Sequence, residues 1–212
     1  MLRIIGGQWR GRKLRFPPSP EIRPTPDRVR ETLFNWLAPR LVGARCLDLF
    51  AGSGALGLES LSRAAGHVSF VERDGAAVKE LVARLSEWGA TGAQVEHGDA
   101  LRFLNGGFGG GGSGRGGGSS AGAGAHGGAG AHPSAGSGAS AAFDIVFLDP
   151  PFGSGLLTTV AGLLEQGHWL ASGALIYVEC AARNGLPELP PNWMASRAKQ
   201  AGEVGYHLLT RA

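Results

Sequence analysis

The feature that most constrains the fold is the alternation of short apolar runs with amphipathic helical segments. The run ARCLDLF at residues 44–50 is almost continuously apolar, as expected of a strand buried on both faces. The apolar spacing of residues 53–64 then predicts a helix. Strands that alternate with helices pair in parallel through right-handed crossovers, so we expect an α/β fold with a doubly wound, Rossmann-like, seven-stranded, mostly parallel sheet. The other expected elements are strands at 67–73, 93–100, 143–149 and 173–180, helices at 75–89 and 155–166, and two strands within 193–211.

The chain divides into a short basic start and a larger α/β unit. Residues 1–40 are expected to form a hairpin and helix extension, and residues 41–212 the main domain. Within the main domain, residues 105–142 consist almost entirely of Gly, Ala and Ser. Such a segment cannot bury enough apolar area to offset the entropy of ordering it, so we expect a flexible insertion.

Basic side chains are concentrated at the start of the chain. Residues 1–40 contain nine Lys or Arg and three Asp or Glu, whereas the whole chain has a formal net charge of only +3. Because Lys and Arg neutralise phosphates and release counterions, a basic arm on a near-neutral body favours a polyanionic partner. A solvated surface without a partner would have the same composition, and charge alone does not separate the two interpretations.

The sequence gives no sign of a metal site or a membrane anchor. Cys46 and Cys180 lack C-x-x-C spacing and belong to strands that a third strand should separate, so we expect free buried thiols and no metal. No apolar run approaches the roughly 20 residues of a membrane span, and the N-terminus lacks the apolar stretch of a signal peptide. A cytoplasmic monomer without membrane contact is the expectation.

A glycine motif follows the first strand of the α/β unit. The stretch DLFAGSGALGLE places Gly52, Gly54 and Gly57 in a G-x-G-x-x-G pattern between a strand and a helix. Glycines there let the backbone turn tightly and approach a ligand. Glu72 ends the next strand, 20 residues after Gly52, where its carboxylate can accept both ribose hydroxyls of an adenosine. The pattern therefore predicts a nucleoside cofactor but does not separate NAD from S-adenosylmethionine.

Two further carboxylates favour S-adenosylmethionine. Asp48 lies four residues before Gly52, where it suits an ammonium group beside the glycine loop, and Asp99 ends the third strand, where it can accept from an adenine amine. A dinucleotide site needs neither. Each residue also has an alternative structural interpretation: a hydrogen bond that braces the loop for Asp48, and a helix cap for Asp99.

The stretch FDIVFLDPPF ends a buried strand with Asp149, two prolines and an aromatic ring. The exocyclic amine of a nucleobase is a poor nucleophile, because its lone pair is delocalised into the ring. The Asp149 carboxylate and the Pro150 carbonyl can each accept one of its N–H groups and direct the lone pair toward a methyl donor. Proline fixes the backbone and adds no competing donor, and Phe152 offers a face on which a base can stack. A base must leave any helix to reach such a pocket.

These motifs in this order resemble the bacterial RsmD family of class I S-adenosylmethionine-dependent methyltransferases. The resemblance rests on RIIGGQWRGRKL, RPTPDRVRETLFNWL, LDLFAGSGALGLESLSR, DIVFLDPPF, ALIYVE and NGLP, and it covers nearly the whole chain outside 105–142. It implies that residues 41–212 form a methyltransferase domain. It also implies methyl transfer from S-adenosylmethionine to N2 of one guanine in small-subunit (16S) ribosomal RNA, free or within an assembling 30S particle.

The resemblance also implies roles for individual residues. The residues implied to hold the cofactor are Asp48, Ala51, Gly52, Ser53, Gly54, Glu72, Arg73, Asp99, Ala100 and Asp149. The residues implied to hold the guanine during catalysis are Asp149, Pro150, Pro151 and Phe152. The residues expected to contact RNA are Arg10, Arg12, Lys13, Arg23, Arg28 and Arg30.

Other functions remain open at this point. An adenine-N6 DNA methyltransferase or a protein glutamine methyltransferase can use a related motif, although the basic N-terminal arm favours RNA. An NAD oxidoreductase would explain the glycine loop but not the Asp-Pro-Pro-Phe turn. A non-catalytic RNA-binding ribosome assembly factor would need the basic arm alone, and binding of S-adenosylmethionine would distinguish it from a methyltransferase.

Overall fold

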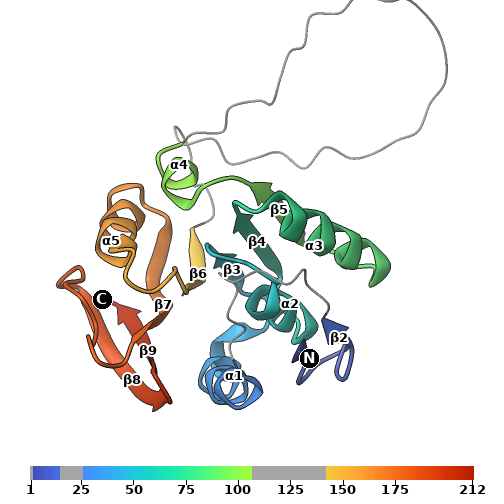
Figure 1. The fold of residues 1–212 in the computed structure, drawn as a ribbon, viewed down its shortest axis with the longest axis horizontal. Helices are drawn as coiled ribbons and strands as arrows, with labels where there is room; N and C mark the ends of the chain where they lie inside the picture. The colour runs from blue at the N-terminus through green and yellow to red at the C-terminus, as the bar shows by residue number, and fades with distance from the viewer. Residues whose placement is uncertain (1, 15–25, 107–141) are drawn as a thin grey trace, which may run out of the picture.

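The computed structural model describes residues 2–14, 26–106 and 142–212 and is built on one seven-stranded sheet (Figure 1). The strand order is β5-β4-β3-β6-β7-β9-β8, and β9 runs antiparallel to both of its neighbours while the other pairs are parallel. This arrangement confirms the expected seven-stranded, doubly wound sheet. The strands are β3 (Arg45–Asp48), β4 (His67–Glu72), β5 (Ala93–His97), β6 (Phe143–Leu148), β7 (Leu170–Ala181), β8 (Trp193–Ala201) and β9 (Val204–Arg211).

Helices cover both faces of the sheet, and each face has its own hydrophobic core. One core joins the sheet to three helices, and the other joins it to two. The helices of the first face are α1 (Asp27–Leu41), α2 (Ala55–Ser62) and α3 (Gly75–Glu87), and those of the second face are α4 (Ala100–Leu104) and α5 (Leu156–Gln166). Because the sheet is covered on both sides, its central strands are apolar along nearly their whole length.

The middle of the sheet is the pairing of β3 with β6. Cys46 lies beside Val68 of β4 on one side and beside Ile145 of β6 on the other. Cys180 lies on β7, so β6 separates the two cysteines, and both are buried free thiols as expected. The same pairing brings the end of β6 next to the end of β3, where the glycine motif begins.

The expected N-terminal hairpin is present among residues 2–14 as β1 (Leu2–Arg3) and β2 (Lys13–Leu14). Its loop is fastened to α2: the carboxylate of Glu59 accepts hydrogen bonds from the backbone N–H groups of Ile5 and Gly6, each at 2.8 Å. The apolar side chains of the hairpin, including Trp9, belong to the same core as α1 and α2. The hairpin therefore packs as part of the body and not as a separate module.

The C-terminal strands also form as expected, with Gly202 at the turn between β8 and β9 in a left-handed conformation (φ +62°). The third expected strand is shorter than predicted. It ends at His97 and not at residue 100, because the Asp99 side chain accepts from the backbone N–H groups of Leu101 and Arg102 and begins α4.

Most of the expected insertion at residues 105–142 lies outside the described residues, so that expectation is not tested. None of the helices in the described ranges has the length and apolar character that crossing a membrane requires.

Candidate active site

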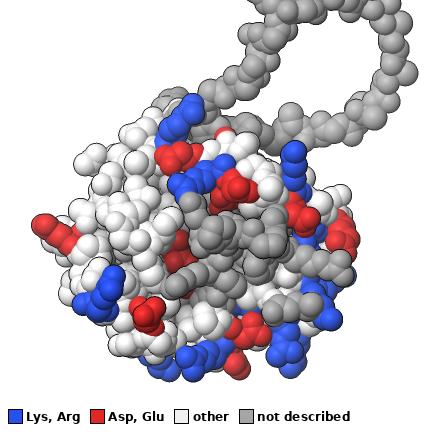
Figure 2. Space-filling model, viewed as in Figure 1, with Lys and Arg blue, Asp and Glu red and all other residues white. Residues whose placement is uncertain are grey.

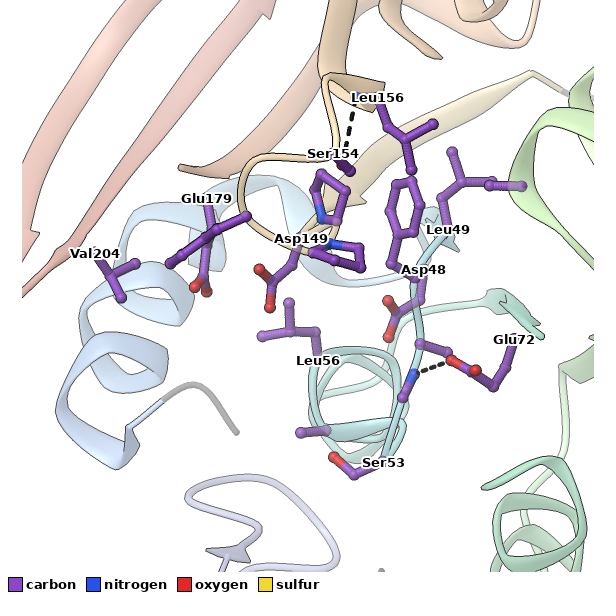
Figure 3. Close-up of a pocket in the computed structure, with 18 of the residues that line it drawn as sticks. Asp48, Leu49, Ser53, Leu56, Glu72, Asp149, Ser154, Leu156, Glu179 and Val204 are labelled. Atoms are coloured by element: carbon purple, nitrogen blue, oxygen red, sulfur yellow. Dashed lines mark hydrogen bonds between the residues drawn. The ribbon is translucent and has the colours of Figure 1, made fainter. Parts of the chain in front are cut away.

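A cavity of about 1,530 Å³ opens where β3, β4 and β6 end (Figure 3). It lies outside the carboxyl ends of the parallel strands, where doubly wound sheets bind their ligands. Its volume exceeds the roughly 300–1,000 Å³ that is usual for a single small-molecule pocket. The cavity therefore has room for a cofactor and for part of a second substrate.

The glycine motif forms the floor of one half of this cavity. Gly52 and Gly54 have positive φ angles of +52° and +73°, which side chains other than glycine rarely adopt. At Gly57 an added Cβ would lie 2.1 Å from the ring of Phe70, so the third glycine allows α2 to pack directly against β4. These are the roles in tight turning and close packing that the sequence pattern predicted.

Asp48 braces the glycine loop from the end of β3. Its Oδ2 accepts a hydrogen bond from the Gly57 N–H at 3.0 Å, and the side chain is buried. Burial raises the pKa of Asp48 to about 7, the Gly57 hydrogen bond opposes this, and the negative charge of Glu72 adds to it. The loop-bracing interpretation is thus correct, and the predicted role beside the cofactor stays a prediction.

Glu72, at the end of β4, is held by backbone donors on both carboxylate oxygens. Oε2 accepts from the Gly52 N–H at 2.6 Å and Oε1 accepts from the Asp74 N–H at 2.7 Å. Figure 3 shows the first of these bonds joining Glu72 to the glycine loop. The backbone thereby fixes the direction of a carboxylate that lines the cavity.

Asp99 lines the same half of the cavity and caps α4 at the same time. Its Oδ1 accepts from the backbone N–H groups of Leu101 at 2.9 Å and Arg102 at 3.3 Å. The capping interpretation of Asp99 is confirmed, and its role toward adenine remains a prediction. The other predicted cofactor residues that line the cavity are Ala51, Ser53, Arg73 and Ala100.

The donor set of this half fits S-adenosylmethionine. The molecule presents ribose hydroxyls, an adenine amine and an ammonium group, all of which donate hydrogen bonds. The cavity offers three carboxylates from the ends of β3 and β4 and the start of α4, namely Asp48, Glu72 and Asp99. A carboxylate has about four acceptor positions, so the backbone bonds already made leave capacity for a ligand.

The opposite half of the cavity is formed by the turn after β6. Asp149, Pro150, Pro151 and Phe152 all line it, which brings the whole predicted motif together beside the cofactor half. Phe152 is 39% exposed, so its ring is one of the few large apolar side chains of the described residues that are exposed. It is therefore available to stack on a planar group that enters the cavity.

Asp149 has no hydrogen bond to its carboxylate from the described residues. Burial raises its pKa well above the ordinary value, and the negative charges of Glu179 and Asp48 raise it further. Acceptors on this side of the cavity are therefore crowded together and poorly solvated, which favours a ligand that brings hydrogen-bond donors.

Glu179 is a cavity residue that the sequence analysis missed. It lies near the end of β7, it is 3% exposed, and its Oε1 accepts a hydrogen bond from the buried hydroxyl of Tyr177 at 2.7 Å. The sequence did contain a signal, because ALIYVEC is an apolar run interrupted only by this carboxylate, as ARCLDLF is by Asp48. A buried carboxylate near a strand end marks both positions.

The predicted RNA contacts have different outcomes. Arg10, Arg12, Lys13 and Arg28 are exposed, and Figure 2 shows basic side chains along the edge of the molecule near the hairpin and α1. The prediction for Arg30 is wrong, because its side chain is fully buried and pairs with Asp27 at 2.6 Å while donating to the Arg3 carbonyl. Arg23 lies outside the described residues.

Within the described ranges, the structure brings together no group of His, Cys, Asp and Glu side chains that could hold a metal ion.

The strand order and the site together define the class. The chain is a class I methyltransferase that uses S-adenosylmethionine. It matches the model of the family described as Conserved hypothetical protein 95 over residues 2–108 and 129–210. It is 47% identical to Ribosomal RNA small subunit methyltransferase D of Escherichia coli (strain K12) over 99% of this chain and 90% of the relative. The chain belongs to this family, the RsmD family that its motifs resemble.

Further comparisons agree with this membership. Ribosomal RNA small subunit methyltransferase D of Haemophilus influenzae is 39% identical over 98% of this chain and 92% of that protein. The solved structure of the Escherichia coli protein yhhF superposes with a TM-score of 0.77 at 45% identity, covering 99% of this chain and 97% of the other. An RNA methyltransferase from Salinibacter ruber, solved with S-adenosyl-L-homocysteine, shares the fold at 14% identity, a TM-score of 0.53, and 89% and 94% coverage.

Proposed function

We propose that this protein transfers a methyl group from S-adenosylmethionine to the exocyclic N2 of a guanine in small-subunit ribosomal RNA. The observation that carries the proposal is the placement of the Asp149–Phe152 turn across the cavity from the glycine loop and Glu72. The names of the Escherichia coli and Haemophilus influenzae relatives support RNA of the small subunit as the substrate.

The half of the cavity formed by Asp149–Phe152 orients the amine. We call it the acceptor half, because it holds the base that accepts the methyl group. The Asp149 carboxylate and the Pro150 carbonyl each accept one N–H of the guanine amine, and Phe152 stacks on the base. S-Adenosylmethionine supplies a methyl group that its sulfonium already activates, so orientation and approach dominate the rate. The amine becomes strongly acidic as the new N–C bond forms, and its proton leaves along the hydrogen bond to Asp149 or to water. A separate strong base is not needed.

The cofactor half binds and positions the methyl donor. Glu72 accepts from the ribose hydroxyls, Asp99 accepts from the adenine amine, and Asp48 faces the ammonium-bearing end beside the glycine loop. Support comes from the backbone N–H groups that hold Glu72 and Asp99 before any ligand arrives. A preoriented acceptor loses little entropy when it binds.

The same proposal assigns a different function to each of the two parts of the chain. Residues 1–40 serve as the RNA-contacting extension and residues 41–212 as the methyltransferase domain. The exposed Arg10, Arg12 and Lys13 contact phosphates, which position the RNA without reading its sequence. Arg12 is held over the ring of Trp88, 5.3 Å from its centre, so its guanidinium is already ordered on the surface.

We further infer that the enzyme is a cytoplasmic monomer that acts on an assembling 30S particle. Its basic surface is small, and ribosomal proteins on the particle would present the target base. Methylation of protein-free RNA at the same rate as subunits would contradict the inference about the particle. Sedimentation of the pure protein as a dimer would contradict the inference about the monomer.

The test of the function is methyl transfer from labelled S-adenosylmethionine to small ribosomal subunits purified from cells that lack this gene. Nuclease digestion and mass spectrometry then identify the modified base. We expect N2-methylguanine with the wild-type protein and none with Asp149→Ala, while calorimetry shows that both proteins bind the cofactor. Methylation of DNA adenine or of a protein glutamine, with ribosomal RNA left unmodified, would replace the proposed acceptor.

A further inference from the structure

A second carboxylate stands beside Asp149 at the acceptor end of the cavity. The pairing of β6 with β7 places Leu148 next to Val178, so Asp149, the first residue after β6, follows on beside Glu179 of β7. Figure 3 shows both carboxylates directed toward the same part of the cavity, and the charge of Glu179 acts on Asp149. Two neighbouring carboxylates offer more acceptor positions than one exocyclic amine can use.

The Asp-Pro-Pro-Phe turn alone does not choose among bases. The amines of guanine, adenine and cytosine each present the same two N–H groups to Asp149 and Pro150. The ring nitrogen beside the amine differs, because N1 of guanine carries a hydrogen, whereas N1 of adenine and N3 of cytosine are acceptors. A buried donor left without an acceptor weakens binding, so a site for guanine needs a third acceptor for N1–H.

We propose that Glu179 accepts the N1–H of the target guanine and so determines which base is methylated. This proposal rests on the proposed function and assigns base selection to a residue outside the Asp-Pro-Pro-Phe turn. The Tyr177 hydroxyl donates to one Glu179 oxygen at 2.7 Å and so orients a carboxylate, a group with about four acceptor positions in all. Adenine and cytosine would turn a lone pair toward this carboxylate, and the repulsion excludes them.

The sharpest test replaces the target guanine with 2-aminopurine, which keeps the N2 amine but has an unprotonated N1. Small subunits are reconstituted with either base at the position that mass spectrometry identifies, and the single-turnover methylation rate is measured. We expect wild-type protein to prefer guanine by about 30-fold or more, since an unpaired site acceptor costs about 2 kcal/mol. In Glu179→Gln the amide can turn its NH₂ toward the unprotonated N1, so the preference falls to within about 3-fold.

Two variants and a binding measurement separate this role from a structural one. Glu87→Gln makes the same change at an exposed carboxylate at the end of α3, which does not line the cavity, and keeps the wild-type preference. Tyr177→Phe removes only the hydroxyl that orients Glu179 and lowers the preference by a smaller factor, about 3-fold to 10-fold. Calorimetry with S-adenosylmethionine shows unchanged affinity in each.

The outcomes are distinct. Equal loss of rate on guanine and 2-aminopurine in Glu179→Gln, with cofactor affinity retained, would overturn the role in base selection. If Glu179→Gln does not fold, an unchanged preference in Tyr177→Phe overturns the proposal instead. Failure of the proposed function appears earlier, as the absence of N2-methylguanine in the wild-type reaction.

Discussion

The carboxylates in the two halves of the cavity differ in the hydrogen bonds that the protein donates to them. In the cofactor half, Glu72 and Asp99 are held by backbone N–H groups that belong to the loops they follow. In the acceptor half, Asp149 has no such donor among the described residues and lies close to the charge of Glu179. The carboxylates of the cofactor half are oriented by hydrogen bonds before a ligand binds. The Asp149 carboxylate is stabilised by the hydrogen-bond donors that a substrate brings.

The difference between the two sets of carboxylates separates cofactor binding from catalysis within one cavity. A carboxylate that the backbone already orients binds tightly and loses little entropy, which suits a cofactor needed in every turnover. A desolvated carboxylate without a partner interacts strongly with a donor at the moment of reaction, which suits the group that orients the amine. Substitutions in each half should therefore affect cofactor binding, rate and stability differently.

Asp149→Asn should lower the rate of methyl transfer on the order of 10³-fold, equivalent to about 4 kcal/mol. The amide keeps the size of the side chain but loses the charge and places an N–H₂ group where the amine must donate. Single-turnover kinetics measure the rate, and calorimetry should give a cofactor Kd within about 3-fold of wild type. A loss of cofactor affinity as large as the loss of rate would contradict the assignment of Asp149 to the acceptor half.

Asp48→Asn should stabilise the protein in a pH-dependent way. Burial raises the pKa of Asp48 to about 7, above the value of about 3.9 in an unfolded chain, so the native state binds the proton more tightly. The wild type therefore loses stability as pH rises from about 4 through 7, by roughly 4 kcal/mol. The variant avoids this loss, so its advantage should be absent near pH 4 and full at pH 8. Denaturant unfolding without cofactor measures it, and a constant difference across this range would contradict the prediction.

Glu72→Gln should weaken cofactor binding about 30-fold, or about 2 kcal/mol. Both Glu72 oxygens accept backbone hydrogen bonds, and the amide can keep only one of them. Calorimetry measures the Kd for S-adenosylmethionine. At saturating cofactor the methylation rate should stay within about 3-fold of wild type, opposite to the result expected for Asp149→Asn.

Gly57→Ala should destabilise the protein by about 1 kcal/mol. The new methyl group would meet the Phe70 ring, a cost of about 1–3 kcal/mol that the better helix propensity of alanine partly offsets. Gly162→Ala, in α5, meets nothing within 4 Å and should stabilise by about 0.5 kcal/mol. Thermal unfolding compares the two, and equal shifts in Tm would show that packing behind the glycine loop does not matter.

Much of this arrangement could be predicted from the sequence, because buried strands and glycine turns leave local patterns. The run around Asp48, the glycine spacing and the Asp-Pro-Pro-Phe turn each identified an element and its place in the sheet. The carboxylates with dual roles were harder. Asp48 and Asp99 do make the structural bonds considered as alternatives, and sequence alone does not decide whether a ligand shares them.

The failures have physical causes as well. Arg30 was assigned to RNA because it lies in a basic arm, but helical periodicity turns it inward, where Asp27 and the more distant Glu59 balance its charge. Glu179 was missed because its place beside Asp149 depends on the pairing of β6 with β7, and neither strand's sequence alone predicts that pairing. Charge counts describe a segment, whereas the role of a charge depends on its neighbours in space.

The pairing of β3 with β6 has a consequence for how the enzyme forms. The Arg45 N–H donates to the Asp144 carboxylate, 99 positions further along the chain. Contacts between such distant residues form late, because a long loop must close before any of them stabilises the chain. A growing chain that has left the ribosome only as far as α4 carries Asp48, Glu72 and Asp99 but not the Asp149–Phe152 turn that follows β6. Activity therefore requires that β6 has already paired with β3, because this pairing brings the Asp149–Phe152 turn beside the cofactor residues.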